Sequence, residues 1–229
     1  MRKKAAVSLL LAASFVLSLS SASDRQVDPT GAAARNPNET AIQPGAIKIP
    51  LPSMAQPDDY SCGAAALMSI CSFYGVGEEQ ITDFKQKVHS NPTNGTNFEN
   101  MIHYAHELGL AADAHRNMTI DELQGYIKEC KPVICSIQAY GKPSDYDRND
   151  NGHYVVAIGF DETNIYFMDP SVPAENRRRG FIPKADLPAR WHDDEADKGQ
   201  PQNIINHLGI VFYPKPGHTA LLTTAMKVP

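Results

Sequence analysis

The chain has 229 residues, of which 42% are hydrophobic and 21% are charged, and its formal net charge is −5 at pH 7. This length and composition are typical of one globular domain with a well-buried core. The acidic balance argues against a nucleic-acid partner, because DNA and RNA are bound through clusters of Lys and Arg.

The first 22 residues have the features of an export signal. Basic residues at positions 2–4 precede an apolar stretch that ends in small residues, and we expect cleavage after Ala22. Cleavage there would remove three positive charges and lower the formal net charge from −5 to −8. The stretch is short and interrupted by serines, and no later segment is apolar enough to span a bilayer, so we expect no stable membrane insertion. The sequence therefore predicts an exported protein and does not distinguish the periplasm from the medium.

The rest of the chain divides into a leader, one folded domain and a tail. Residues 23–45 have no regular period and are expected to form a flexible leader, and the tail, residues 215–229, is expected to be mobile. Between them, in the domain of residues 46–214, periodicity and capping residues predict helices over residues 62–74, 78–88, 98–108 and 120–129. Strands are predicted over residues 46–50, 110–115, 132–138, 153–160, 165–168 and 207–213. Residues 171–206 are expected to be irregular, with one short helix near residues 184–191.

The order of these elements predicts the fold class. Most helices come first, the strands that can pair as an antiparallel sheet follow, and there is no βαβ alternation. The sequence therefore predicts one α+β domain in which N-terminal helices pack on a central antiparallel sheet.

Cys62 stands where the irregular loop of residues 56–61 becomes a helix. A thiol at a helix N-terminus faces unpaired backbone N–H groups and the positive end of the helix dipole, and both favour the nucleophilic thiolate. The same N–H groups can hold an oxyanion, to which the amide of Gln56 could donate a second hydrogen bond. Gly63 would let a substrate carbonyl approach the backbone closely. The alternative is a buried structural cysteine at the start of an Ala-rich core helix.

The other three cysteines, Cys71, Cys130 and Cys135, allow two interpretations. Export makes disulfides possible, and Cys71 faces away from Cys62 on the same helix, so a bridge from Cys71 to Cys130 or Cys135 is one alternative. Three small buried hydrophobic side chains are the other. The chain has no C-x-x-C pair, and we expect neither a metal nor a cofactor.

A hairpin over residues 153–168 supplies the polar partners that a cysteine nucleophile needs. If Phe160 pairs with Asn164, the odd-numbered residues of both strands share a face, and His153 lies diagonal to Asp169. A slip of one residue would put these two side chains on opposite faces of the sheet.

In that register His153 can take the proton from Cys62, and Asp169 can hold the ring in one tautomer. Taken singly, His153 could be a satisfied structural histidine, and Asp169 a turn residue at a strand end. Their joint occurrence with a helix-start cysteine and the loop residue Gln56 favours a catalytic site.

Two stretches of the sequence resemble a known family. Q-P-D-D-Y-S-C-G-A-A-A-L, from Gln56, and G-H-Y-V-V-A-I-G-F-D, from Gly152, with N-I-Y-F-M-D-P-S after it, resemble the bacterial cysteine peptidases that remove double-glycine leader peptides from bacteriocins, and their stand-alone secreted relatives. The resemblance covers roughly residues 46–213 and implies a papain-like fold.

The resemblance also implies a role for each residue of the proposed site. It implies Cys62 as nucleophile, His153 as general base, Asp169 as the residue that orients the imidazole, and Gln56 as oxyanion donor. This chain has Ala64 where the family often has proline.

The sequence thus predicts an exported papain-like cysteine peptidase that acts on a peptide or protein substrate. Gly63, Gly152 and Tyr154 are predicted to contact that substrate. Two alternatives stay open: an acyltransferase that uses the same acyl-enzyme, and a weakly active peptide-binding module of the same fold. The sequence does not predict the cleavage specificity or the oligomeric state.

Two further patterns are assigned no site. Asp147-x-Asn149-x-Asn151 resembles the first half of a calcium loop, but Ile158, within a strand, stands where the bidentate glutamate should be, so we interpret it as a plain turn. The arginines at positions 177–179 are interpreted as a solvated loop, the alternative being contact with an acidic substrate tail.

Overall fold

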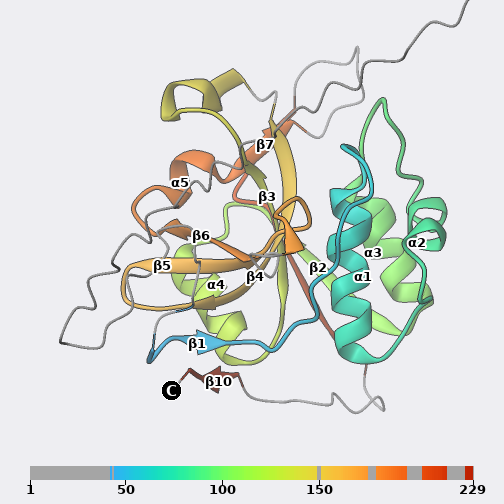
Figure 1. Ribbon diagram of the computed structural model, residues 1–229, viewed down its shortest axis with the longest axis horizontal. Helices are drawn as coiled ribbons and strands as arrows, with labels where there is room; N and C mark the ends of the chain where they lie inside the picture. The colour runs from blue at the N-terminus through green and yellow to red at the C-terminus, as the bar shows by residue number, and fades with distance from the viewer. Residues whose placement is uncertain are drawn as a thin grey trace, which may run out of the picture. The chain divides into compact units, whose positions relative to one another are not determined.

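An antiparallel sheet with helices packed against it makes up the described part of the chain (Figure 1). The computed structural model describes residues 42, 44–148, 151–174, 179–194, 203–215 and 225–228, which all belong to the compact unit that begins at residue 37. The predicted export signal and the predicted leader as far as residue 41 lie outside the described residues. The predicted α+β class is confirmed.

Four helices lie in the first half of the described chain: α1 (Cys62–Tyr74), α2 (Ile81–Lys87), α3 (Phe98–Glu107) and α4 (Ile120–Lys128). Three of their ends lie at capping residues. Asn97 accepts a hydrogen bond from the backbone N–H of Glu99, and Thr119 and Glu122 form a capping box at the start of α4. Gly75 ends α1 with φ 69°, a left-handed conformation that glycine adopts at little steric cost.

Helix α1 is the buried helix of this group. Eleven of its 13 residues are buried, because it packs against β4 of the sheet (Gly152–Phe160) and against α2 and α3. A helix that is apolar on every side needs such neighbours all round. Figure 1 shows α1, α2 and α3 standing together beside the sheet. This packing fixes the first turn of α1, where Cys62 lies.

Within the described residues the main sheet has eight strands, and every pairing is antiparallel. Its order is β10-β1-β4-β3-β9-β2, with β5 added on β4 and β6 on β5. The strands besides β4 are β1 (Ile47–Lys48), β2 (Leu110–His115), β3 (Val133–Gln138), β5 (Asn164–Met168), β6 (Arg179–Pro183), β9 (Gly209–Pro214) and β10 (Met226–Lys227). Strands β3 and β4 are buried almost throughout and form the centre, with Ile137 of β3 opposite His153 of β4.

The hairpin of β4 and β5 changes register along its length. Near the turn, Phe160 lies opposite Ile165, so the predicted pairing with Asn164 is wrong there by one residue. The register then shifts between Gly159 and Ala157, in a β-bulge that takes up one residue.

The bulge decides which side chains of the hairpin meet. Beyond it the strands follow the predicted register, with Val156 opposite Met168. Without it, the one-residue slip near the turn would continue and place His153 and Asp169 on opposite faces of the sheet. The bulge therefore keeps both residues on one face.

The segment predicted as irregular contains short strands. Besides the edge strand β6, it holds β7 (His192–Asp194) and β8 (Ile204–Asn206), which form a separate two-stranded sheet, while helix α5 (Leu187–Arg190) lies at the predicted helical position. A short 3-10 helix, Pro143–Arg148, lies in the predicted loop before β4. The segment expected to be a mobile tail contains β10, which pairs with β1, so that β1 has a neighbour on both sides.

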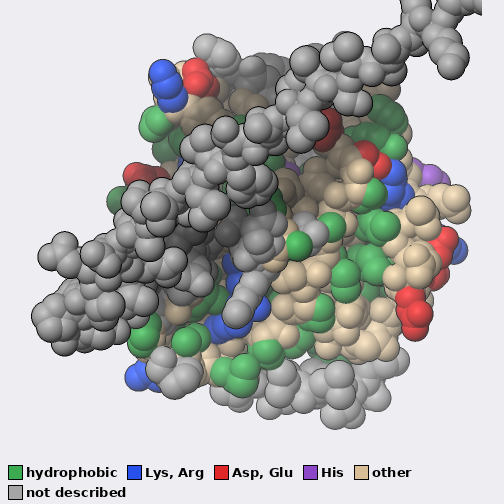
Figure 2. Space-filling view, in the orientation of Figure 1, with side chains coloured by type: hydrophobic (Ala, Val, Ile, Leu, Met, Phe, Trp, Pro, Cys, Tyr) green, Lys and Arg blue, Asp and Glu red, His purple; other side chains and the backbone are tan. Residues whose placement is uncertain are grey.

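Charged side chains are unevenly distributed over the described surface. In the orientation of Figure 1, Figure 2 shows mostly hydrophobic and uncharged atoms on the described surface, with acidic side chains along the right-hand edge over the helices. None of the helices in the described ranges has the length and apolar content needed to cross a membrane.

Candidate active site

Cys62 is the first residue of α1, at the end where backbone N–H groups have no partner within the helix. The N–H of Ala65 donates to the C=O of Ser61, and no side chain caps this end. The first turn also contains no acidic residue. The positive end of the helix dipole therefore faces a thiol that is buried but still 8% exposed.

His153, near the start of β4, and Asp169, directly after β5, lie in contact. Nε2 of His153 is 2.7 Å from Oδ1 of Asp169. The same oxygen accepts hydrogen bonds from the backbone N–H of Ser171 at 2.9 Å and from its hydroxyl at 2.7 Å. These bonds hold the carboxylate in place against an imidazole that is only 4% exposed. The structure thus brings together the two residues that the hairpin pattern paired.

The charge of His153 follows from its neighbours. Burial lowers the pKa of His153, but hydrogen bonds to Asp169 and to the sulfur of Cys62, with the charges of both groups, outweigh burial and raise that pKa to about 10. Burial alone would raise the pKa of Asp169, but the bond to His153, its charge and the bonds from Ser171 lower it. Because Nε2 of His153 faces Asp169, Nδ1 is the ring nitrogen left for the sulfur. The geometry favours an imidazolium between sulfur and carboxylate.

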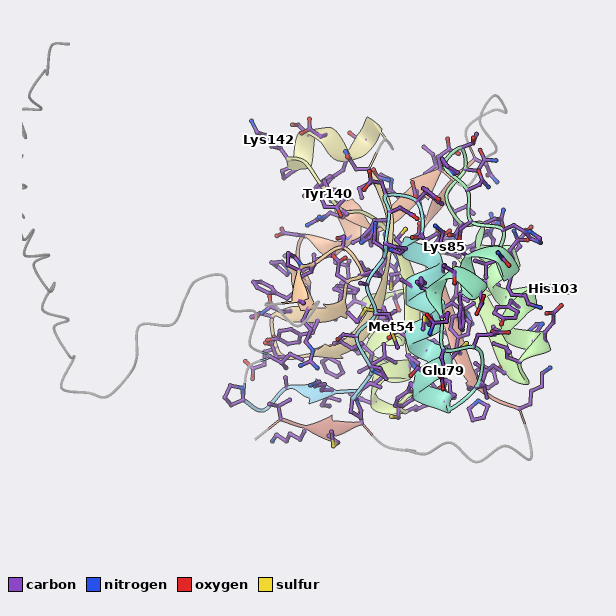
Figure 3. The ribbon with its side chains drawn as sticks, turned by 45° about the vertical axis from the view of Figure 1, so that its right-hand side comes forward. Met54, Glu79, Lys85, His103, Tyr140 and Lys142 are labelled. Atoms are coloured by element: carbon purple, nitrogen blue, oxygen red, sulfur yellow. The ribbon has the colours of Figure 1, made fainter. Side chains whose placement is uncertain are left out.

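Tyr140 covers one side of the histidine and aspartate pair. Its hydroxyl donates to the Ser171 hydroxyl oxygen at 2.8 Å, and its ring centroid lies 5.9 Å from that of His153. The side chain of Tyr140 is 52% exposed, so it stands between solvent and the hydrogen bond beneath it. Tyr140 comes from the segment after β3 and is labelled in Figure 3.

Gln56 is fastened to the segment that follows Asp169. Its backbone N–H donates to the C=O of Pro170 at 3.1 Å. Its side-chain Nε2 donates to the C=O of Asp58 at 2.9 Å, while its buried Oε1 has no hydrogen-bond partner among the described residues. An amide nitrogen carries two N–H groups, so one remains for another acceptor. Asp58 forms an ion pair with Lys85 of α2, and this pair ties the loop to that helix. Lys85 is labelled in Figure 3.

A cavity of about 210 Å³ opens beside Cys62. Its walls include His153 and the predicted substrate contacts Gly152 and Tyr154. A larger cavity, of about 670 Å³, lies at β1 and the turn after β4 and is lined by other residues. Of these two cavities, the smaller one is lined by Cys62.

Gly63, the third predicted substrate contact, packs into the protein. A Cβ at this position would lie 2.7 Å from Cβ of Thr96 and 3.1 Å from Sδ of Met101. The missing side chain therefore lets the first turn of α1 pack against α3 and the loop before it. Gly63 is not among the residues that line the cavity beside Cys62.

Three carboxylates line this cavity: Asp59 from the loop before α1, and two from a later segment that the sequence analysis did not single out. Asp193 and Asp194 belong to β7, which packs beside β3 and β4. They lie in the segment predicted as irregular, where the sequence W-H-D-D-E shows neither a period nor a motif. Only the long-range packing of β7 brings them to the site, so the sequence offered no signal for them.

The remaining cysteines are buried and unbridged. Cys62, Cys71, Cys130 and Cys135 are all free, so the alternative of a disulfide from Cys71 is wrong. Burial, with a smaller contribution from the charge of Glu78, raises the pKa of Cys71, and burial alone raises the pKa of Cys130 and Cys135. In the described ranges no three His, Cys, Asp or Glu side chains are grouped so that they could hold a metal ion.

Comparison with known protein families matches residues 48–197 to the Peptidase_C39 like family. The chain belongs to this family. The match confirms the resemblance to double-glycine leader peptidases and includes Gln56, Cys62, His153 and Asp169 within its bounds. No curated protein matches the chain.

Solved structures of C39 peptidases share the fold of this C39-like chain. A protein from Bacillus anthracis described as a C39-like peptidase has a TM-score of 0.55 and 15% sequence identity, covering 74% of this chain and 98% of its own. The peptidase domain of Streptococcus ComA, a bi-functional ABC transporter involved in a quorum sensing pathway, has a TM-score of 0.52 and 21% identity, covering 72% of this chain and 99% of its own. Similarity at this identity confirms the papain-like fold predicted from the sequence.

Proposed function

We propose that this chain is a cysteine peptidase in which Cys62, His153 and Asp169 form the catalytic triad. The observation that carries the proposal is the buried imidazole of His153, which is hydrogen-bonded to Asp169 and to Cys62 at the N-terminal end of a helix. Membership of the C39-like family supports it. The substrate is a peptide or a protein.

In the proposed reaction, the sulfur of Cys62 attacks the carbonyl carbon of the scissile bond. A C–S bond forms, and the carbonyl oxygen takes up the negative charge. The backbone N–H of Cys62 and the remaining N–H of the Gln56 amide stabilise this oxyanion. The imidazolium of His153 gives its proton to the leaving amine, and the C–N bond breaks to leave a thioester.

The second half of the reaction releases the acyl group. His153, now neutral, takes a proton from a water molecule, whose oxygen attacks the thioester carbon. The C–S bond breaks, the acid leaves, and the sulfur of Cys62 and the imidazolium are restored. Asp169 keeps the ring oriented through both steps.

We also propose that the mature enzyme acts outside the cytoplasm and consists of the domain of residues 46–214 with its flanking segments. The basic and apolar pattern of the first 22 residues supports removal of an export signal after Ala22. The check is the mass of the protein recovered from a cell fraction: a chain that begins at Ser23 supports export, and an intact Met1 contradicts it.

The deciding experiment is the digestion of an unbiased peptide library, followed by mass spectrometry. Wild type should cleave a subset of peptides, and Cys62→Ala, verified to be folded by circular dichroism, should cleave none of them. A variant without the thiol that cleaves the same peptides would contradict the proposal. Products joined to an added amine, in place of free acids, would instead indicate the acyltransferase alternative.

A second measurement separates an enzyme from a binding module. Iodoacetamide should alkylate Cys62 much faster than the three buried cysteines, which serve as internal controls in the same chain. Alkylation that is equally slow at all four sites would contradict the peptidase proposal. The readout is the mass of each cysteine-containing peptide after a timed reaction.

A further inference from the structure

A carboxylate on β7 abuts the segment that carries the proposed catalytic histidine. A Cβ on Gly152 would lie 2.1 Å from Oδ2 and 2.4 Å from Oδ1 of Asp193, so this carboxylate occupies the space where a side chain would otherwise be. Gly152 directly precedes His153 in β4. Asp193 also lines the cavity beside Cys62. The carboxylate therefore lies against both the histidine segment and the cavity.

The oxygens of Asp193 accept hydrogen bonds from two buried side chains of β3. Nε2 of Gln138 donates to Oδ1 at 3.1 Å, and the hydroxyl of Ser136 donates to Oδ2 at 3.1 Å. Gln138 is 0% exposed, so water cannot replace the acceptor that Asp193 provides. Loss of the Asp193 carboxylate would therefore leave a buried N–H of Gln138 without this acceptor.

Gln138 transmits this constraint to the chain just before His153. Its Nε2 also donates to the C=O of His192 at 3.2 Å, and its Oε1 accepts the backbone N–H of Asn151 at 3.2 Å. The amide therefore has its nitrogen toward β7 and its oxygen toward Asn151. The Asp193 carboxylate, which only accepts, favours this orientation together with the C=O of His192 and the N–H of Asn151, whereas an amide or a protonated acid at position 193 could turn a donor toward Nε2, which is itself a donor.

We propose that Asp193 is a positioning residue for the reaction. Through Gln138 its carboxylate holds residues 151–153, and so keeps the imidazole of His153 aligned between Cys62 and Asp169. The inference rests on the proposed peptidase function and adds a residue that touches none of the reacting atoms. Three elements contribute: β7 supplies the charge, β3 the amide, and β4 the histidine.

The protonation of Asp193 makes this alignment depend on pH. Burial raises the pKa of Asp193, hydrogen bonds from the N–H of Asp194 and from Ser136 and Gln138 lower it, and the charge of Asp194 raises it, with a balance at about 6. Above that pH the carboxylate accepts from both side chains of β3. Below it, the added proton turns one oxygen into a donor and weakens the hold on Gln138. The charged or titratable groups around it are Asp194 of β7 and His153 of β4, together with Asp59 and Cys62, which line the same cavity. Arg190 of α5 bonds to the C=O of Gln138.

The test follows the rate at which iodoacetamide alkylates Cys62, from pH values well below 6 to well above it. This readout needs no known substrate. In wild type the rate should rise through a step near pH 6, because the step reports ionisation of Asp193. In Asp193→Asn the step should vanish, and the rate at neutral pH should fall roughly 10- to 100-fold, the effect expected of a misplaced catalytic group.

Two further variants make the result specific. Asp186→Asn removes the same charge from an exposed residue at the start of α5 and should keep both the step and the rate. Gln138→Met keeps the volume but not the hydrogen bonds, so it should slow alkylation as Asp193→Asn does, and the double variant should be no slower than either single one. Circular dichroism and melting temperature verify that each variant is folded.

The outcomes are distinct. A step near pH 6 that persists in Asp193→Asn would overturn the proposed role of Asp193 and leave the peptidase proposal standing. Effects of the two single variants that multiply in the double variant would do the same. If Asp193→Asn does not fold, the wild-type profile and Gln138→Met decide, and a wild-type profile without the step overturns the inference. If wild type shows no selective alkylation of Cys62, the peptidase proposal fails, and this inference fails with it.

Discussion

A buried histidine with a raised pKa makes stability depend on pH. A histidine ordinarily has a pKa near 6.5. In the folded chain burial lowers the pKa of His153, but Asp169 and Cys62 outweigh burial and raise this pKa to about 10. The folded state therefore binds a proton more tightly than the unfolded state between these two values. The stabilisation is complete below pH 6.5 and is lost as the pH rises toward about 10.

The first prediction compares wild type with His153→Gln by urea unfolding at several pH values. The difference in the free energy of unfolding should be largest below pH 6.5 and should shrink as the pH approaches about 10. Ile137→Val is the matched control, since Ile137 lies opposite His153 in β3 and carries no ionisable group. It should cost about 0.5–1.5 kcal/mol at every pH. A His153 difference that is equally flat would contradict the raised pKa.

Tyr140 gives a second prediction at the same scale, because it lies over the bond between His153 and Asp169. Tyr140→Phe keeps the ring but loses the hydrogen bond to Ser171, and should lower kcat/KM by roughly 2- to 10-fold, the worth of one net hydrogen bond. Tyr140→Ala also opens the pair to water and should lower it further. Peptide cleavage measures both variants, and equal rates in wild type and Tyr140→Ala would show that the ring does not shield the pair.

At the scale of single elements, the sequence predicts best where local chemistry decides. The capping box at Thr119 and Glu122 and the αL glycine at Gly75 fix helix ends by contacts within a few residues, and both helix ends lie where expected. The hairpin register is different. The residues around the turn fit two turn lengths that differ by one residue, so the sequence does not distinguish them. The slip at Phe160 and the bulge that corrects it depend on packing against neighbouring strands.

Gly63 is predicted to admit a substrate, and the structure shows that it also has a packing role. A glycine after a candidate nucleophile suggests close approach of a substrate, but the neighbours of Gly63 are Thr96 and Met101. The sequence could not distinguish these causes, because the contact joins α1 to a loop and a helix about thirty residues away.

The third prediction tests this packing with two glycine-to-alanine substitutions. Gly63→Ala would place its Cβ 2.7 Å from Cβ of Thr96 and should destabilise the chain by about 1–3 kcal/mol, the usual cost of overpacking. Gly125→Ala, inside α4, meets nothing within 4 Å and should stabilise by about 0.5–1 kcal/mol through helix propensity. Thermal unfolding measures both variants, and shifts of the same sign would contradict the packing role of Gly63.

At the scale of the whole molecule, the parts that sequence analysis missed are held by distant partners. Strands β7 and β10 have three and two residues, and such short segments carry no readable period. Each exists because a remote strand offers its edge, β8 to β7 and β1 to β10. The proposed triad could be predicted because Cys62 and His153 lie near the starts of long, patterned elements and Asp169 follows a strand of the same hairpin, whereas Asp193 reaches the cavity on one of these short strands.

The C-terminal strand covers an edge of the sheet that would otherwise be open. β1 pairs with β4 on one side and with β10 on the other, and beside β10 the N–H of Val228 donates to the C=O of Ala46 at 2.8 Å while the N–H of Gly45 donates to the C=O of Val228 at 2.7 Å. Without this strand, β1 would present unpaired N–H and C=O groups to other chains. His153 lies at the opposite end of β4 from the residues that pair with β1, and its partner in the sheet is Ile137 of β3.

The last prediction removes this cover. A chain that ends at Thr224 should melt lower, by about 2–4 °C for each kcal/mol lost, and should associate as its concentration rises, because β1 becomes an edge strand. Val228→Pro removes one donor to Ala46 and should show the same trend in weaker form. The alkylation rate of Cys62 per folded chain should stay at the wild-type value. Light scattering measures the association, and thermal unfolding measures the change in melting temperature. A shortened chain that stays monomeric and melts like wild type would mean that β10 does not protect the sheet. A changed alkylation rate of Cys62 would mean that the tail reaches the site.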